Sequence, residues 1–399
     1  MTEPLLPVAE ALDRVLALMA PVGTETAPLA EAGGRVLAED AVAGRDQPPF
    51  PASAMDGWAV RAADVAAGAP LRRVGTAPAG RAWAGSLGPG ETVRIFTGAP
   101  LPDGADAVLI QEDAEAEGDR VSPRAAVSPG QWVRPAGLDF ADGFRIAAPR
   151  RLSAADIALL GAMNVAAPGL RRRPRVAIIP TGDELVEPGE TPAADQIIAS
   201  SHVGLAAMLS AAGAAAEARP IARDTRAALG AALEAAAAEA DLVVTLGGAS
   251  VGEHDLVREV VGDAALAFYR IAMRPGKPLM AGRFHGVPLI GLPGNPVSAM
   301  VCGRLFLRPA LDALLGLPAG PPPRETATLA ADLPANGPRE HFMRATLTGG
   351  PGAWRATAFA DQDSSRLGVL AAADALIVRA PHAPALSAGG AVEILRLRD

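Results

Sequence analysis

Charged, glycine-rich loops follow three short apolar stretches in the second half of the chain. The stretches span residues 175–179, 241–246 and 287–290, and the loops after them span 181–185, 247–255 and 291–296. Short runs rich in β-branched residues predict buried strands of a parallel sheet. In an open α/β sheet, ligands bind in the crevice outside the carboxyl ends of the strands. We therefore expect these three loops to converge on one site.

The loop after the second stretch has residue types suited to an anion and a metal. Gly247 and Gly248 let backbone amides approach an oxyanion, Ser250 adds a hydroxyl donor, and Asp255 could hold a divalent cation or position a water. Taken alone, such a loop is more often only a turn. Asp255 could equally cap the helix expected directly after it.

Carboxylates follow two further strands of the expected sheet. Asp183 and Glu184 come just after the first stretch, where one could cap a turn and the other could face the crevice as a metal ligand or general base. Asp224 follows the strand expected at 215–221, and it could either serve the site or cap the helix that begins at residue 226. The residues alone leave these alternatives open.

Two further segments could bind an anion. Arg274 and Lys277 flank Gly276 in a turn stiffened by two prolines, where Arg can grip a phosphate bidentately and Lys acts as a point charge. The alternative is an ordinary surface loop. Residues 292–299 begin a helix expected over 297–307, and first-turn amides of a helix suit an anion. The helix is the prediction, and the anion is a hypothesis.

Residues in the first half are more ambiguous. Asp56 precedes Gly57, and an Asp-Gly pair is typical of a hairpin turn, so Asp56 need be no more than a turn residue. Thr97 has the same ambiguity. The five histidines show neither metal-ligand spacing nor a serine nucleophile to serve, so the sequence gives no support to a catalytic triad.

Composition excludes several classes of protein. A formal charge of −8 argues against nonspecific nucleic-acid binding, which needs a basic surface. The single cysteine, Cys302, excludes an internal disulfide and a cysteine metal cluster, and we expect it to be a buried, inert thiol in a helix. No charged leader precedes a long apolar stretch, which predicts a cytoplasmic protein that does not enter a membrane.

The chain of 399 residues is long enough for several domains, and its patterning divides it into four parts. Helical periodicity at 8–20, and a capping-box-like start at Ser153 and Asp156, predict a helical linking domain from residues 1–43 and 143–173. Residues 44–142 read as a β-rich insertion, 174–317 as a doubly wound α/β domain, and 321–399 as a small β-barrel. The predicted fold class is therefore multidomain α/β.

Six motifs, taken in order, resemble one family. They are residues 53–58 (SAMDGW), 94–100 (RIFTGAP), 181–185 (TGDEL), 247–255 (GGASVGEHD), 274–278 (RPGKP) and 292–298 (LPGNPVS). This set resembles the molybdopterin molybdenumtransferases, the MoeA and gephyrin E-domain family. An ordered set of six is far more specific than any single motif, and the resemblance covers essentially the whole chain, being weakest after residue 320.

The resemblance implies an elongated four-domain homodimer with a MogA-like sheet domain. It implies an enzyme of molybdenum cofactor biosynthesis that inserts molybdate into adenylylated molybdopterin and releases AMP with Mg²⁺. It also implies partners such as molybdopterin adenylyltransferase and other molybdenum-cofactor proteins, with no nucleic acid or membrane. In relatives the site lies between the sheet domain of one subunit and the β-rich insertion of the other.

The resemblance also assigns site residues. The catalytic residues it implies are Asp56, Thr97, Glu184, Asp224, Asp255 and Lys277, of which Glu184, Asp224 and Asp255 would hold the metal. The ligand-binding residues it implies are Gly247, Gly248, Ser250, Gly252, Arg274, Gly276, Pro293, Gly294, Asn295, Ser298 and Ser364.

The chain departs from the family pattern at three places. Relatives usually carry Lys where Arg274 stands, Ala-Ser-Ser occupies 199–201 in place of a common Asp-Ser-Asn, and residues around Ser364 replace a Gly-Ser-Gly-like turn. Two alternatives remain, a molybdopterin adenylyltransferase and a non-catalytic gephyrin-like scaffold. The adenylyltransferase normally lacks the flanking insertion and barrel, and the scaffold normally carries a long linker, so the sequence favours the insertase.

Overall fold

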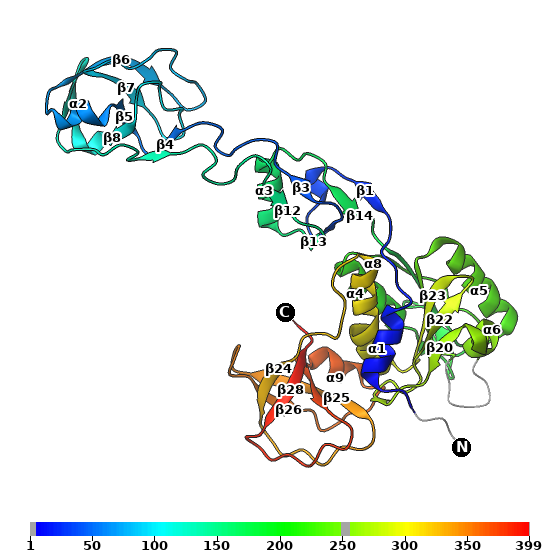
Figure 1. Ribbon diagram of the computed structural model, residues 1–399. Coiled ribbons are helices and arrows are strands. Elements are labelled where there is room, and N and C mark those ends of the chain that lie inside the picture. Colours follow the sequence, from blue (N-terminus) through cyan, green and yellow to red (C-terminus); the bar gives the residue numbers. More distant parts are fainter. Residues whose placement is uncertain (1–4, 249–255, 399) are drawn as a thin grey trace. The chain divides into compact units, whose positions relative to one another are not determined.

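The chain folds into two compact units. The computed structural model describes residues 5–248 and 256–398. Unit 1 contains Met1–Glu25 and Leu170–Asp399, and unit 2 contains Thr26–Gly169 (Figure 1). The chain passes between the units at two short strands, β1 (Thr24–Thr26) and β14 (Gly169–Arg171). Unit 2 is therefore an insertion into unit 1.

A six-stranded sheet forms the centre of unit 1. In spatial order its strands are β18 (Ala215–Ala218), β15 (Arg175–Pro180), β19 (Leu242–Leu246), β23 (Val287–Leu292), β22 (Met280–Phe284) and β20 (Leu266–Tyr269). The first four run parallel and the last two are antiparallel. The strands expected at the three apolar stretches are therefore confirmed, and they are direct neighbours.

Helices cover both faces of this sheet, as a doubly wound fold requires. On one face, Ile179 and Val243 pack with Leu229 and Leu233 of α5. On the other face, α4 packs against β15 and α7 against β23. The helices are α4 (Ser201–Ala211), α5 (Arg226–Glu239), α6 (Leu256–Val261), α7 (Pro296–Cys302), a π-helix (Gly303–Leu307) and α8 (Arg308–Leu314). The single helix expected over 297–307 is thus α-helical only as far as Cys302.

Helix α1 (Val8–Leu16) belongs to unit 1 although it precedes the insertion. Its buried Leu12 and Val15 lie on the side that packs against α8, β20 and β22. The Leu6 carbonyl accepts a hydrogen bond from the Ala272 amide at 2.7 Å, and the Val22 amide donates to the Leu314 carbonyl at 2.8 Å. Helix α3 (Ala154–Ala162) lies in unit 2, so the two helical signals fall in different units. The finer domain boundaries stay predictions.

An ion pair fixes the start of the central strand β15. Both terminal nitrogens of Arg172 donate to the Asp241 carboxylate at 2.6 Å, and the Arg175 amide donates to it at 2.8 Å. Burial raises the pKa of Asp241, but these hydrogen bonds and the two positive charges outweigh burial and lower it. The arginine-rich run at 171–175 therefore anchors the start of the sheet.

We expect Asp241→Asn to destabilise unit 1 by about 2 kcal/mol, because charge-assisted hydrogen bonds at a mostly buried carboxylate are lost. The Asp241 pKa is lower in the folded than in the unfolded chain, so the pair stabilises the fold fully above pH 4 to 5. Its contribution is lost as pH falls through the folded value. Urea unfolding of both proteins between pH 7 and 3 should show the difference shrinking with acidity, and a pH-independent difference would contradict this.

Unit 2 contains a six-stranded sheet of order β8-β5-β7-β6-β10-β9. Its strands are β5 (Gly57–Val60), β6 (Leu71–Ala77), β7 (Glu91–Ile95), β8 (Ala107–Ile110), β9 (Ala114–Glu117) and β10 (Arg120–Pro123), and α2 (Ala62–Ala66) lies beside them. Short pairs join β4 (Ala52–Ser53) to β11 (Val133–Arg134), β3 (Ala41–Val42) to β12 (Arg145–Ile146), and β2 (Val36–Leu37) to β13 (Arg150–Arg151).

Two local predictions in unit 2 have different outcomes. The capping box is confirmed, because Ser153 caps α3 and its amide donates to the Asp156 carboxylate at 2.8 Å. The hairpin turn at Asp56-Gly57 is wrong. Strand β4 pairs with β11, whereas β5 pairs with β7 and β8, so the residues on either side of Asp56 belong to different pairings. Gly57 is needed instead for close packing, since a Cβ there would lie 2.2 Å from the Leu109 carbonyl oxygen.

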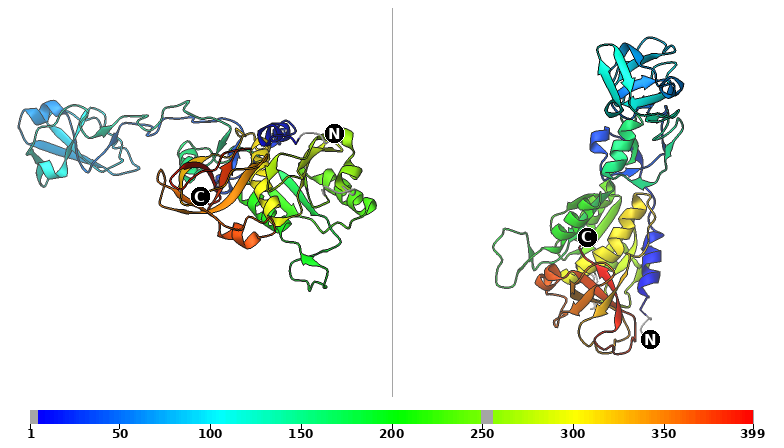
Figure 2. Two further views of the ribbon diagram at one scale, coloured as in Figure 1. Left: turned by 90° about the horizontal axis from the view of Figure 1, so that it is seen from below. Right: turned by 90° about the vertical axis from the view of Figure 1, so that its left-hand side faces the viewer.

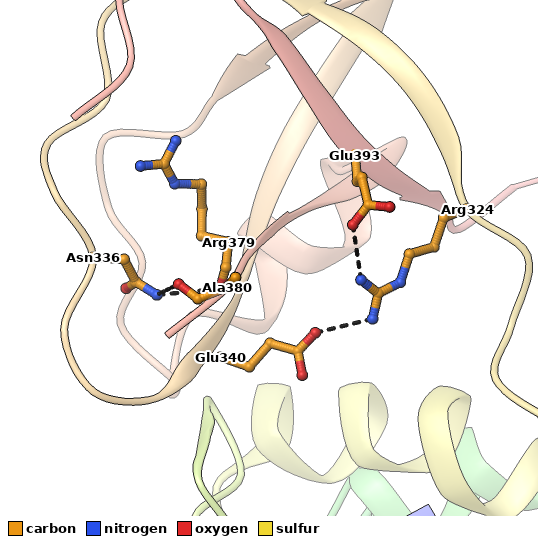
Figure 3. Close-up of polar contacts among 6 residues, drawn as sticks. All are labelled: Arg324, Asn336, Glu340, Arg379, Ala380 and Glu393. Carbon is orange, nitrogen blue, oxygen red and sulfur yellow. Dashed lines mark hydrogen bonds and ion pairs between the residues drawn. The ribbon is translucent and has the colours of Figure 1, made fainter. Parts of the chain in front are cut away.

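The C-terminal strands of unit 1 close into the predicted barrel. These strands are β24 (Glu325–Leu329), β25 (Glu340–Thr348), β26 (Arg355–Ala358), β27 (Ala375–Arg379) and β28 (Ala391–Arg396), with α9 (Leu367–Ala372) beside them. A shorter strand from earlier in the chain, β21 (Met273–Arg274), pairs with β25 outside the closed ring. Closure comes from the pairing of β27 with β25. Arg324 joins β25 to β28 by donating to Glu340 and Glu393, each at 2.9 Å (Figure 3).

Asn336 contacts the backbone at the end of β27. Its side-chain amide donates hydrogen bonds to the carbonyl oxygens of Arg379 and Ala380 (Figure 3). In the described residues, no helix combines the length and apolarity needed to cross a membrane.

Candidate functional site

A pocket of about 660 Å³ lies at the carboxyl ends of β15, β19 and β23. Its walls include Thr181 and Glu184 after β15, Gly247 after β19, and residues 293–296 after β23. The convergence expected from the sequence is therefore confirmed for the described parts of the three loops, of which the second is described only at Gly247 and Gly248. A cavity of this size at the edge of a parallel sheet is typical of a site for a small molecule.

Glycines allow the loops to approach one another closely. Gly247 has φ +85°, and a Cβ there would lie 2.7 Å from the Thr181 carbonyl oxygen. A Cβ on Gly294 would lie 3.4 Å from the Gly247 Cα. Thr181 is buried, and its hydroxyl donates to the Leu246 carbonyl at 3.2 Å. Backbone rather than side chains therefore forms this part of the wall, as the glycine pattern predicted.

One carboxylate lines the pocket, and two more follow the neighbouring strands without lining it. Glu184 lines it, and its carboxylate lies against Gly182, where a Cβ would come within 2.5 Å of Oε2. Asp183 and Asp224 form a reciprocal pair, in which each carboxylate accepts a hydrogen bond from the other's amide, at 3.2 and 3.3 Å. The proposed capping role of Asp224 is wrong. Thr225 caps α5 through a hydrogen bond from the Ala228 amide, because it directly precedes the first helical residue.

The barrel contributes a turn to the pocket. Ser365 lines the pocket, and the side-chain amide of Asn295 donates to the Ser364 hydroxyl at 3.0 Å. The Val297 amide donates to the Ser364 carbonyl at 3.1 Å, so this first-turn amide of α7 is already used by the protein. Arg344 is almost fully buried and donates to the Asp363 carbonyl at 2.8 Å, which fixes the turn.

The turn at 274–277 supplies positive charge near the barrel. Arg274 is exposed on β21, directly opposite His341 of β25, and Lys277 is half-buried. Burial, and then the charge of Arg274 and three further arginines, lower the pKa of His341 to about 4. These arginines are Arg339, Arg344 and Arg379. Because His341 is neutral at pH 7, the positive potential there belongs to the arginines. Pro278, which directly follows this turn, lines the pocket, whereas Arg274 and Lys277 do not.

Gly276 ties this turn to the buried thiol. It has φ +117°, and a Cβ there would lie 2.6 Å from Cys302 Sγ. Cys302 is fully buried, as expected, and burial raises its pKa far above the ordinary thiol value. We expect Gly276→Ala to displace the turn and to lower turnover about tenfold, because small displacements of binding groups are costly.

A second substitution tests the cause of that loss. Cys302→Ala in the Gly276→Ala chain removes the clash with sulfur but keeps the unfavourable φ, so the double variant should recover part of the loss. Steady-state kinetics of the two single variants and the double variant give the coupling between the sites. Strictly additive effects would show that the contact with sulfur is not responsible.

Asp56 and Thr97 contact each other in unit 2. The Thr97 amide and hydroxyl both donate to Asp56 Oδ1, at 2.8 and 2.7 Å. These bonds, first from the amide and then from the hydroxyl, lower the pKa of Asp56, and nearby Arg94 lowers it further. Asp56 is therefore a fixed carboxylate, ionised throughout the neutral range.

We expect Thr97→Val to raise the pKa of Asp56, because one of two hydrogen bonds to the ionised form is removed while the amide bond remains. The melting temperature at pH 7 should fall only slightly, because a raised Asp56 pKa removes a small part of the stability of the folded chain and both side chains are partly exposed. Carboxyl ¹³C titration by NMR measures the shift directly. An unchanged Asp56 pKa would mean that the amide and Arg94 alone account for its depression.

Some predicted site residues fall elsewhere. Ser250, Gly252 and Asp255 lie outside the described residues. In the described part of the chain, no group of three or more His, Cys, Asp or Glu side chains is placed to hold a metal.

Four residues that line the pocket were not identified from the sequence, namely Ser200, Ser201, His202 and Ser365. The departure from the family pattern at residues 199–201 could have pointed to Ser200 and Ser201. No feature of the sequence pointed to His202.

Family models match nearly the whole chain. The "MoeA N-terminal region (domain I and II)" matches residues 6–164, the "Probable molybdopterin binding domain" matches 177–313, and the "MoeA C-terminal region (domain IV)" matches 326–397. The second match contains the loops that form the pocket, and the third contains the turn at Ser364.

Similar proteins span comparable lengths. Molybdopterin molybdenumtransferase 2 of Mycobacterium tuberculosis is 38% identical over 335 residues, which cover 81% of this chain and 83% of the relative. The molybdopterin molybdenumtransferase of Bacillus subtilis is 31% identical, with 99% and 94% covered. The crystal structure of the molybdopterin biosynthesis MoeA protein from Pyrococcus horikosii superposes with a TM-score of 0.88 at 30% identity, covering 99% of this chain and 100% of that one. The chain therefore belongs to the MoeA family of molybdopterin molybdenumtransferases, enzymes of molybdenum cofactor biosynthesis.

Proposed function

We propose that this enzyme inserts molybdate into adenylylated molybdopterin, with release of AMP, at the pocket bounded by β15, β19 and β23. The observation that carries the proposal is the convergence of Glu184, the Gly247 loop and residues 293–296 around one cavity of about 660 Å³. Such a cavity has the size of a drug-sized organic ligand. Family membership supplies the substrate class.

The chemistry of each residue suggests its role in the proposed reaction. Backbone at Gly247 and Gly294 leaves room for a polyanion to approach without side-chain obstruction. Arg274 and Lys277 carry the charge that would neutralise a departing AMP, and His341, which is neutral, adds no positive charge of its own. Arg344 and Asn295 hold the Ser364 turn in place. Asp56, kept ionised by Thr97, is assigned to the same reaction by family resemblance.

We propose Mg²⁺ as the metal, with Glu184 as its ligand among the described pocket residues. Mg²⁺ is usually held by one or two carboxylates together with substrate phosphates rather than by a cage of protein ligands. A pocket with one lining carboxylate and room for phosphates fits that mode. When bound, the ion would offset negative charge on the pyrophosphate. Asp224 is the weaker candidate, because it does not line the pocket.

One assay tests the proposal. The protein is incubated with adenylylated molybdopterin, molybdate and Mg²⁺, and AMP is measured by chromatography. AMP release that requires molybdate supports the insertase. Synthesis of adenylylated molybdopterin from ATP and molybdopterin would instead identify an adenylyltransferase, and tight substrate binding with neither reaction would identify a scaffold.

We also propose a homodimer that works with a molybdopterin adenylyltransferase, on the strength of the family resemblance. Light scattering in solution should give twice the chain mass of 40.4 kDa. A monomer at micromolar concentration would contradict the dimer. Transfer of adenylylated molybdopterin from a purified adenylyltransferase, measured in the presence of an excess of a trapping protein, tests the second part.

A further inference from the structure

The segment between β15 and α4 projects from the sheet domain and has few attachments to it. It contains β16 (Leu185–Val186) and β17 (Ile197–Ile198), which pair in parallel, and both views of Figure 2 show this green segment standing out from the domain. Its inner end carries Glu184, and Ile197 and Ile198 line the pocket although they are 59% and 40% exposed. The segment is therefore one wall of the site.

Hydrogen bonds within the segment hold its two strands to each other. The Ile197 amide donates to the Glu184 carbonyl at 2.8 Å, and the Ala199 amide donates to the Val186 carbonyl at 2.9 Å. The position of Glu184 is thus coupled to that of β17. These bonds do not attach the strand pair to the rest of the domain.

One side-chain contact makes that attachment. His202, in the first turn of α4, is 2% exposed, and its Nε2 lies 3.2 Å from Glu187 Oε2. Because an ionised carboxylate can only accept, Nε2 is the donor. Among the described residues, no other hydrogen bond or ion pair joins residues 185–198 to a residue outside 182–200.

Among the described residues, Glu187 is also the only hydrogen-bond partner of the His202 side chain. Its Nδ1 is buried without a hydrogen-bond partner, so the bond to Glu187 is what orients the ring. The helix that carries the ring is itself firmly packed, because Gly303 lies under Leu205 and Gly204 lies against Met300. His202 is therefore a fixed point, and Glu187 is the movable partner.

We propose that His202 is a positioning residue, which through Glu187 anchors the strand pair β16–β17 and so holds Glu184 and Ile197 in the wall of the pocket. The inference rests on the proposed function only for the role of Glu184. The anchor itself is a property of the protein without ligand.

Hydrogen exchange of the free protein tests the anchor. His202→Phe keeps a ring of similar size but removes the donor, and His202→Gln keeps an N–H donor. We expect the Ile197 and Ala199 amides to exchange about tenfold faster in His202→Phe and nearly as in wild type in His202→Gln. Val203→Ala is the matched control, because Val203 is the next residue of α4, is 48% exposed and does not line the pocket.

Kinetics test the consequence for the site. With adenylylated molybdopterin as the probe, His202→Phe should raise KM about tenfold without changing the melting temperature. His202→Gln, which keeps a donor, should have a KM close to that of the wild type. If His202→Phe does not fold, Glu187→Ala removes the same bond from the half-exposed side and should give the same exchange and KM.

The three possible failures are distinguishable. If a folded variant without the bond between His202 and Glu187 exchanges its Ile197 and Ala199 amides at the wild-type rate, His202 does not anchor the segment, whatever the activity of the variant. Faster exchange with an unchanged KM overturns its link to the site. Absence of AMP release by the wild-type protein overturns the proposed function instead, while the exchange experiment still decides whether His202 holds the segment.

Discussion

Replacing Glu184 by Gln should lower kcat for AMP release on the order of 100- to 1,000-fold, with a much smaller change in KM. Gln keeps the shape of the side chain against Gly182 but removes the charge, and loss of one charged group that acts in the transition state has effects of this size. The corresponding loss of transition-state stabilisation is about 3–4 kcal/mol. Steady-state kinetics at saturating Mg²⁺ measure it.

The matched control is Glu190→Gln. Glu190 is exposed on the same projecting segment and does not line the pocket, and its carboxylate accepts a hydrogen bond from the Glu187 amide that Gln can also accept. Its kcat should remain that of the wild type. If Glu184→Gln retains full activity while this control does too, Glu184 is a wall residue, and the charge needed for the reaction comes from elsewhere.

Replacing Gly247 by Ala should lower AMP release by about 100-fold or more and also destabilise unit 1 by about 3 kcal/mol. The backbone there has φ +85°, which costs a non-glycine residue about 1–2 kcal/mol. The added Cβ would also lie 2.7 Å from the Thr181 carbonyl oxygen, so two of the three loops must separate. A displacement of that kind is costly to catalysis.

Gly262→Ala separates the two causes. Gly262 has φ +82°, almost the same as Gly247, but a Cβ there would meet no heavy atom within 4 Å. It should therefore show the conformational cost alone and keep its activity. Equal destabilisation of the two variants by urea unfolding would mean that the contact with Thr181 relaxes without effect.

Much of this site could be predicted because its signals are local. Each of the three apolar stretches predicts its own strand, and parallel strands necessarily bring their carboxyl ends to one edge, so Glu184, Gly247 and Pro293 could be grouped before their positions were known. The capping box at Ser153 and Asp156 depends on residues three apart, which is why it was also predictable.

The errors and omissions depend on partners that are distant in sequence. Asp56-Gly57 has the composition of a hairpin turn, but strand pairing with β7, β8 and β11 decides its geometry, and local composition does not contain that pairing. Thr225 rather than Asp224 caps α5, because the helix begins at Arg226, and the Asp224 carboxylate instead accepts a hydrogen bond from the amide of Asp183, 41 residues away. The roles of Arg344 and His202 could not be predicted either, because the sequence does not show their contacts with the turn at Asp363 and with Glu187.

The position of α1 has a consequence for the order of synthesis. Unit 2 uses one continuous stretch, Thr26–Gly169, so all of it is synthesised before the first strand of the central sheet. Helix α1 is made before both, yet the Ala267 carbonyl, to which the Arg14 side chain of α1 donates a hydrogen bond, comes 253 residues after Arg14. At about 5–20 residues per second, α1 waits on the order of tens of seconds with its apolar face uncovered. The nascent chain therefore completes the inserted unit first, while the N-terminal helix remains the part that a chaperone would have to shield.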